Sequence, residues 1–218
     1  MPETTSKFRT LSGRPRAVEG TLLIALTLTS ATWATQVHHH LPWAFFNEQF
    51  LGAFLGLSLA SVFIAVKARG GEAGDRVPVF DWALSALGLV VGGYVSVMYP
   101  TIAYRLGELT TDRVALGTAA VLLVLEAARR LAGGTLAWVA LGCILYAKFA
   151  WLLPSLLYAK GSSWPRIVSY LYLDTNGVFG VPLQVAASVL VAFVFFGHAL
   201  YAVRGDRFLM EIDRKSVV

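Results

Sequence analysis

The sequence predicts an all-α, polytopic membrane protein with about six transmembrane helices and both termini in the cytoplasm. Hydrophobic residues make up 56% of the 218 residues and charged residues 14%, whereas a soluble domain carries about a quarter charged residues. The uncharged residues form continuous runs, which disfavours a β-barrel. Several runs can cross a hydrocarbon core of about 30 Å as a helix of roughly 20 residues. Stretches without Asp, Glu, Lys or Arg cover residues 20–47, 49–66, 82–104, 131–147 and 175–203.

Six predicted spans follow one another along the chain. They cover residues 19–37, 46–66, 80–99, 114–131, 135–157 and 181–203. The first ends in Ala-Thr-Trp-Ala, which loosely resembles a cleavage site; the later spans favour an uncleaved helix, and a signal peptide stays open as the alternative. Gly133 and Gly134 predict a tight connection between spans four and five. Ser163 and Pro165 predict the start of an interfacial helix within residues 158–180.

Lysine and arginine set the predicted orientation. The first connection has none, and the third and fifth connections have two each. They also occur in the N-terminus, the second connection, the end of span four and the segment after span six. The positive-inside rule places these basic segments, and therefore both termini, in the cytoplasm. The net charge of +5 is explained in this way, so we expect no nucleic-acid partner.

Charged residues inside or near the spans are candidates for function. Glu126 precedes Arg129 and Arg130 by three and four residues, a spacing that places all three on one helix face. An ion pair near the interface is the favoured interpretation. A charged relay in a transport path is the alternative, because ionisable groups inside membranes are functional candidates. Lys148 lies near the middle of span five, where we expect it to pair with an acid on a partner helix; snorkelling to the surface is the alternative.

Histidine and cysteine give little indication of catalysis. His38, His39 and His40 are consecutive on a loop and present metal ligands poorly, so we expect no metal site. We expect His198 in span six to form a hydrogen bond between helices. The single Cys143 excludes an intrachain disulfide. Motifs for a nucleophile elbow, a phosphate-binding loop or a zincin are absent from the sequence, so we expect no enzyme activity and no cofactor.

Glycine and proline mark two further features. A helix break at Gly177, Gly180 and Pro182 precedes span six. It is interpreted either as a flexible elbow or as part of the broken-helix architecture of a transporter. Glycines at four-residue spacing predict close helix packing, at Gly52, Gly56, Gly88, Gly92 and Gly93.

Three stretches, in this order, resemble the N-terminal part of a fused permease of the tripartite ATP-independent periplasmic (TRAP) transporters. They are Val-Phe-Asp-Trp at 79–82, Leu-Glu-Ala-Ala-Arg-Arg at 125–130, and Tyr-Leu-Asp-Thr-Asn-Gly-Val-Phe-Gly-Val-Pro-Leu at 172–183. The chain is most similar to the type that fuses a four-helix and a twelve-helix part and works with a TAXI-family solute-binding protein. The resemblance covers residues 76–211, and the N-terminal third only by hydropathy.

The resemblance implies a division of labour between two membrane parts. A small four-helix part acts as scaffold, and a large part carries the substrate and sodium sites and moves as an elevator. Mapped on this chain, residues 1–18 are a cytoplasmic segment, 19–132 the small scaffold and 133–212 the start of the large part. The implied partners are the remaining large-permease region or subunit, a periplasmic TAXI-type binding protein and the lipid bilayer of a bacterial inner membrane. Sodium is the implied coupling ion.

The implied function is sodium-coupled uptake of small organic acids, with this chain acting at most as scaffold. The family's helical hairpins have no counterpart here, so no substrate or sodium ligand is carried over. Residues 213–218, Asp-Arg-Lys-Ser-Val-Val, match a translated sequencing adapter; we expect a truncated fragment with an artefactual tail, and a natural short subunit is the alternative. Two other functions are a structural small subunit of a membrane complex and a membrane-embedded enzyme using His38–His40, Glu126 or His198.

Overall fold

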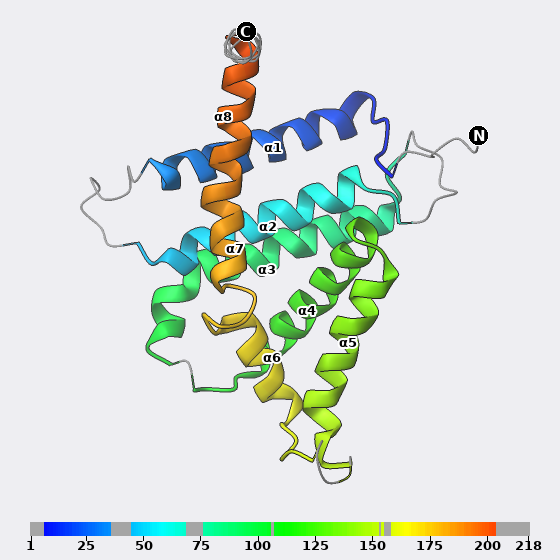
Figure 1. Ribbon diagram of the computed structural model, residues 1–218, viewed down its shortest axis with the longest axis vertical. Helices are drawn as coiled ribbons and strands as arrows, with labels where there is room; N and C mark the ends of the chain where they lie inside the picture. Colours follow the sequence, from blue (N-terminus) through cyan, green and yellow to red (C-terminus); the bar gives the residue numbers. More distant parts are fainter. Residues whose placement is uncertain are drawn as a thin grey trace, which may run out of the picture.

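The computed structural model describes residues 7–35, 45–68, 76–105, 107–152, 154 and 158–203. These residues form helices and their connections, plus an isolated antiparallel bridge between Phe8 and Val66 (Figure 1). The α-helices are α1 Gly13–Ala34, α2 Asn47–Ala65, α3 Val79–Ala103, α4 Thr111–Leu131, α5 Gly134–Phe149, α6 Trp164–Leu173, α7 Val181–Val185 and α8 Val191–Ala202. A 3₁₀ turn, Ala150–Leu152, extends α5, and a π-helical turn, Ala186–Leu190, joins α7 to α8.

Five of these helices are long and apolar enough to cross a membrane. They are α1, α2, α3, α5 with its 3₁₀ extension, and the continuous helix from α7 to α8. The predicted class of helical membrane protein agrees with this finding. Helix α4, the fourth predicted span, is not among the five. Charged residues occupy both of its ends, with Asp112 in the first turn and Arg129 and Arg130 in the last.

Helix α2 is at the centre of the molecule and packs along the antiparallel helix α3. Their closest approach is made by glycines: a Cβ at Gly92 would lie 2.4 Å from the Gly52 carbonyl oxygen and 2.5 Å from the Gly56 Cα. The predicted close packing is therefore confirmed for Gly52, Gly56, Gly88 and Gly92. The prediction is wrong for Gly93, whose Cβ position has no described atom within 4 Å, because it lies about 100° around α3 from Gly92.

Helices α1, α4 and α6 surround this pair. Trp33 of α1 stacks on Phe50 of α2 with ring centroids 4.4 Å apart. Helix α6 packs on α4 at Gly117, where an added Cβ would lie 2.5 Å from Val168 and 3.2 Å from Tyr172. The predicted helix within 158–180 thus begins at Trp164 and ends at Leu173, and it buries one face against the bundle.

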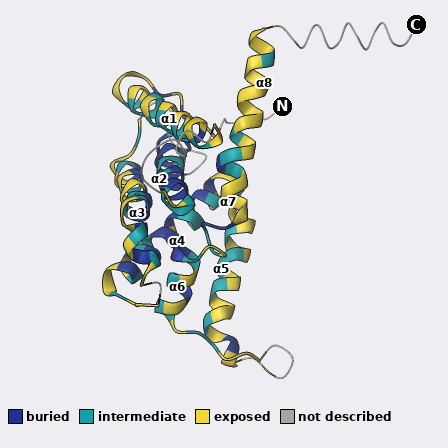
Figure 2. Ribbon diagram, turned by 90° about the vertical axis from the view of Figure 1, so that its left-hand side faces the viewer, coloured by how far each residue is buried: buried dark blue, intermediate teal, exposed yellow. Residues whose placement is uncertain are grey.

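Helices α5 and α8 are peripheral. They contain no buried residue, and Figure 2 shows both largely in the colour of exposed residues. Helices α1, α2 and α3 lie side by side, whereas α8 runs across them in Figure 1 and stands beside them in Figure 2. The first helix begins at Gly13, not at Glu19, so residues 13–18 of the predicted N-terminal segment are helical. The predicted tight connection at Gly133 is confirmed: α4 ends at Leu131, α5 begins at Gly134, and Gly133 has a φ of +99°.

Candidate functional site

Charged side chains from three parts of the chain meet at one end of the bundle. Here α2 and α4 end, α3 begins, and residues 7–9 cross over them. The backbone of this N-terminal strand pairs with residues 65–67, through Arg9 N–H to the Ala65 carbonyl (2.8 Å) and Lys67 N–H to the Lys7 carbonyl (3.1 Å). We call the meeting point the charge cluster; its members are Arg9, Asp81, Glu126, Arg129 and Arg130.

Asp81 is the buried centre of the charge cluster. It lies in the first turn of α3 and is 1% exposed. One carboxylate oxygen accepts a hydrogen bond from Arg9 Nη2, and the other accepts one from Arg130 Nη2 at 2.7 Å. Both arginine side chains are fully buried. A carboxylate at a helix N-terminus is also favoured by the helix dipole. Both the two arginines and the helix dipole therefore stabilise the negative charge of Asp81.

Glu126 extends the charge cluster toward the surface. It accepts hydrogen bonds from Arg130 Nε at 2.8 Å and from Arg129 Nε and Nη2, both at 2.7 Å. The predicted pairing with Arg129 or Arg130 is therefore present with both arginines. Its two-bond contact with Arg129 is the more exposed part, with the Arg129 side chain 43% exposed.

The arginines also satisfy the end of α2. The last carbonyl groups of a helix lack partners within the helix. Arg9 Nη1 donates to the carbonyls of Phe63 (3.0 Å) and Ile64 (3.1 Å), and Arg130 Nη1 donates to that of Val66 (3.2 Å). The guanidinium of Arg130 also lies 5.0 Å from the Phe63 ring centroid. The charge cluster thus links residues 7–9, the end of α2, the start of α3 and the end of α4. Such contacts hold helices together, which is a structural role.

Two members of the charge cluster were missed by the sequence analysis. Asp81 was placed in a motif without a partner, and Arg9 was counted only as an orienting cation. A signal for Asp81 was available, because an acid at the first turn of an apolar span requires a compensating charge. Arg9 gave no such signal, since it is 72 residues away from Asp81 in the chain.

The turn before α7 is a second candidate site. Asp174 accepts two hydrogen bonds from Asn176, from its backbone N–H (2.8 Å) and its side-chain amide (2.9 Å). Just before it, Tyr172 is fully buried and donates its hydroxyl to the Val91 carbonyl at 2.7 Å. The bonds to Asp174 lie within the turn, the Tyr172 bond joins α6 to α3, and Val178 N–H binds the Leu171 carbonyl of α6 (2.8 Å).

Gly177, Gly180 and Pro182 shape this turn. A Cβ at Gly177 would lie 2.4 Å from the Leu171 carbonyl oxygen and 2.5 Å from that of Tyr170, so no larger residue fits without a shift. Gly180 is the N-cap of α7 and Pro182 lies in its first turn, where proline is favoured. The helix then continues through the π-helical turn to Ala202.

The remaining candidates do not join either site. Lys148 lies in the last turn of α5, not in the middle of a span, and its Nζ is 5.5 Å from the ring centroids of Phe149 and Trp164. The expected partner acid is replaced by aromatic faces, because neither α5 nor the α6 helix beside it contains an acidic residue. His198 is exposed on α8. The histidines at 38–40 lie outside the described residues.

Neither the geometry nor the comparisons assign a catalytic role to the described residues. Within the described ranges, no group of three or more His, Cys, Asp or Glu side chains could hold a metal ion. The charge cluster and the turn before α7 instead serve as joints between helices. Comparisons of the chain with protein-family models, with curated proteins and with solved structures gave no match.

Proposed function

We propose that this chain is the scaffold part of a TRAP-type, binding-protein-dependent secondary transporter in a bacterial inner membrane. The observation that carries the proposal is the bond between Asp81 and Arg130. These residues belong to two of the three stretches that resemble the fused permease, and they lie 49 residues apart in the chain. The third stretch supplies Tyr172, whose hydroxyl binds the Val91 carbonyl of α3. All three stretches therefore contribute to holding one helical unit together.

The proposal includes α4 as a sixth span, with both termini in the cytoplasm. Helix α4 is not among the five long apolar helices, and it carries Asp112, Arg113, Glu126, Arg129 and Arg130. Its last-turn arginines are neutralised by Asp81 and Glu126, and paired charges are the form in which ionisable groups are found in membranes. The charge cluster also gathers residues 7–9, residues 66–68 and the end of α4 at one end of the bundle. The distribution of Lys and Arg predicts the same cytoplasmic side for all three.

In this proposal the scaffold moves no substrate by itself. Elevator transport requires a mobile element whose site uses half-helix ends and unwound backbone near the membrane midplane. The described irregular backbone at 174–180 forms a compact turn with internal hydrogen bonds. The large-permease region would supply the substrate and sodium sites, and a TAXI-type binding protein would deliver the small organic acid.

Reconstitution tests this function directly. The purified chain, alone or combined with a separately produced large-permease region of a TAXI-type transporter, is placed in proteoliposomes with the binding protein. We expect the chain to bind the large region, and sodium-driven uptake of a dicarboxylate or amino acid only when both parts are present. Uptake by the chain alone, or failure to bind the large region, would contradict the proposal.

Single cysteines test the topology in intact cells. In a Cys143→Ser background, we expect His39→Cys and Gly107→Cys to react with an impermeant maleimide from outside, and Gly71→Cys to remain unlabelled. Labelling of Gly71→Cys from outside would overturn the orientation.

A structural small subunit of a different membrane complex is the second candidate. It is favoured by the same joints and by the exposed apolar surfaces of α5 and α8, which require lipid or protein around them. Purification of the chain from its native membrane with an associated protein distinguishes the two, because only the first candidate requires a permease and a binding protein.

A further inference from the structure

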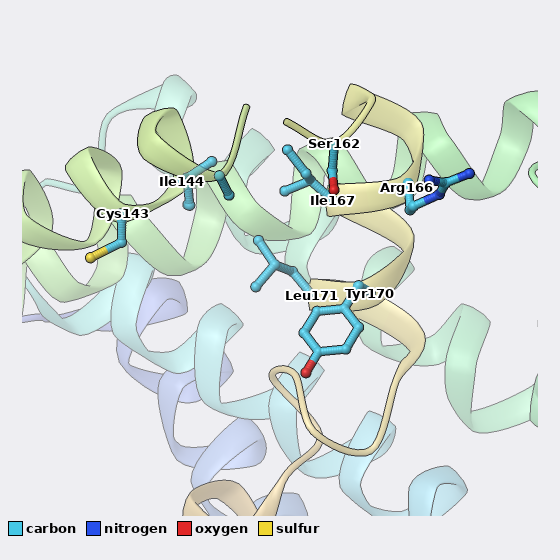
Figure 3. A pocket seen from close by; sticks show the side chains of 8 residues that line it. Cys143, Ile144, Ser162, Arg166, Ile167, Tyr170 and Leu171 are labelled. Carbon is cyan, nitrogen blue, oxygen red and sulfur yellow. The ribbon is translucent and has the colours of Figure 1, made fainter. Parts of the chain in front are cut away.

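The hairpin of α5 and α6 contains an apolar cavity of about 360 Å³. Ile144 and Ala147 of α5 line one wall, and Ile167 and Leu171 of α6 line the other (Figure 3). A second cavity of about 270 Å³ lies on the other side of α6, beside Leu109 and Ser169. Arg166 and Tyr170 line both cavities, so the two form a bipartite groove with an apolar and a more polar part.

The wall of this groove is fixed by backbone contacts. The segment before α6 binds the end of α5, through Ser162 N–H to the Ala147 carbonyl (3.1 Å) and Ala159 N–H to the Ala150 carbonyl (3.3 Å). A Cβ at Gly161 would lie 2.6 Å from the Lys148 carbonyl oxygen. Close contact at this point holds α6 at a fixed distance from α5.

The charge around the groove is mainly positive, with three cations and one acid. Residues 134–173 contain three cations, Lys148, Lys160 and Arg166, and no Asp or Glu. The next residue, Asp174, lines the second cavity together with Arg166, and its carboxylate accepts two hydrogen bonds from Asn176. Lys160 and Arg166 are exposed, and Figure 3 shows the Arg166 side chain extending from α6 away from α5. In the proposed topology these cations lie on the outer side of the membrane, where the positive-inside rule does not account for them.

We propose that this bipartite groove binds one anionic phospholipid. An acyl chain occupies the apolar cavity between α5 and α6, and the phosphate binds Arg166, with the Tyr170 hydroxyl one helical turn away. Arginine is suited to phosphate because its planar guanidinium donates two parallel hydrogen bonds. Basic pockets between membrane helices are known to hold anionic headgroups. The apolar wall supplies the affinity for the acyl chain, and the excess of cations over the single acid Asp174 supplies the preference for a negative headgroup.

Cys143 provides a built-in reporter, since it is the chain's one cysteine and lines the apolar cavity. The full chain in non-ionic detergent is treated with a maleimide after addition of phosphatidylglycerol, phosphatidylcholine or glycerol 3-phosphate. We expect phosphatidylglycerol to slow the alkylation of Cys143 several-fold, and the other two to change it little. Arg166→Gln should abolish the protection, whereas Arg16→Gln, an exposed arginine of α1, should retain it.

Native mass spectrometry gives a second measurement. The wild-type chain should retain one phosphatidylglycerol that Arg166→Gln loses. Equal protection by phosphatidylcholine would mean that any acyl chain fills the groove, and it would overturn the anionic specificity. Protection that survives Arg166→Gln would overturn the headgroup site, and unchanged reactivity of Cys143 with every lipid would overturn occupancy of the groove. Protection by glycerol 3-phosphate alone would assign the site to a free phosphate compound and not to a lipid.

Discussion

Helices α2 and α5 have the same mean hydropathy, 1.6, but opposite surroundings. In an apolar stretch of 18 residues taken from each helix, 61% of the residues of α2 are buried inside the molecule. The share is 6% for α5 with its 3₁₀ extension and 6% for the helix from α7 to α8. Apolar composition therefore shows only that a helix avoids water. The two helices differ in specific contacts. Helix α2 has glycines that face glycines of α3, and buried arginines bind the carbonyl groups at its end. Helix α5 has neither feature, and its large apolar side chains face outward.

The directions of the helices also distinguish the core from the peripheral helices. Helices that cross one bilayer lie within about 40° of its normal. Helix α8 runs across α1, α2 and α3 (Figure 1), so these helices share one bilayer only if they tilt strongly in different directions or if α8 changes direction relative to them. The core formed by α2 and α3 needs no such change, because its contacts are made by backbone and by buried side chains. We therefore expect substitutions in the core to affect folding, and those on α5 and α8 to affect association.

The largest effect is expected for Asp81→Leu. This change leaves the buried guanidinium groups of Arg9 and Arg130 without their shared carboxylate, and loss of one partner of a buried ion pair costs about 3–5 kcal/mol. Unfolding of the chain in mixed micelles measures the loss. The matched control is Glu108→Gln, in the exposed pair with Arg105 (3.7 Å), where a surface ion pair contributes at most about 1 kcal/mol. Equal stability of the two variants would mean that the charge cluster does not hold the bundle together.

Two adjacent glycines provide the next test. In Gly92→Ala the new methyl group meets backbone atoms of Gly52 and Gly56 at 2.4–2.5 Å, and such overpacking costs about 1–3 kcal/mol. In Gly93→Ala the methyl group enters open space, and helix propensity favours alanine by about 1 kcal/mol. The free energy of unfolding should therefore change in opposite directions. The same sign for both variants would contradict the observed register of α2 and α3.

A single hydroxyl is expected to have a smaller effect. Tyr172→Phe keeps the buried ring but removes the hydrogen bond to the Val91 carbonyl, and a hydrogen bond of this kind contributes about 0.5–1.5 kcal/mol. Tyr201→Phe is the control, since Tyr201 is 74% exposed on α8. The unfolding midpoint should fall for the first variant only. A similar decrease for Tyr201→Phe would show that α8 is held in the folded chain by contacts that its exposure does not indicate.

The sequence predicted the helical membrane class, the glycine packing apart from Gly93, and the Glu126 pairing, because each depends on spacing within one or two helices. It did not predict the bond between Arg9 and Asp81, which depends on how distant segments meet. Lys148 was placed too deep because span five was predicted to reach residue 157, whereas α5 ends at Phe149 and its 3₁₀ extension at Leu152. Hydropathy also gave no sign that α2 would be buried and α5 exposed. The six-span topology and the transport function stay predictions.

The smallest effect on the chain alone is expected for Phe193→Ala on α8. Phe193 is 68% exposed, so its removal loses few contacts within the chain. Phe63→Ala is the matched substitution in the core: Phe63 is fully buried, and loss of a buried phenylalanine side chain costs about 3–5 kcal/mol. If a large-permease region covers α8, Phe193→Ala should weaken the association of the two parts while the unfolding of the chain alone stays unchanged. Equal binding by wild type and Phe193→Ala would mean that lipid, and not protein, surrounds this side of α8. Equal destabilisation by the two alanine variants would instead contradict the division between a buried core and peripheral helices.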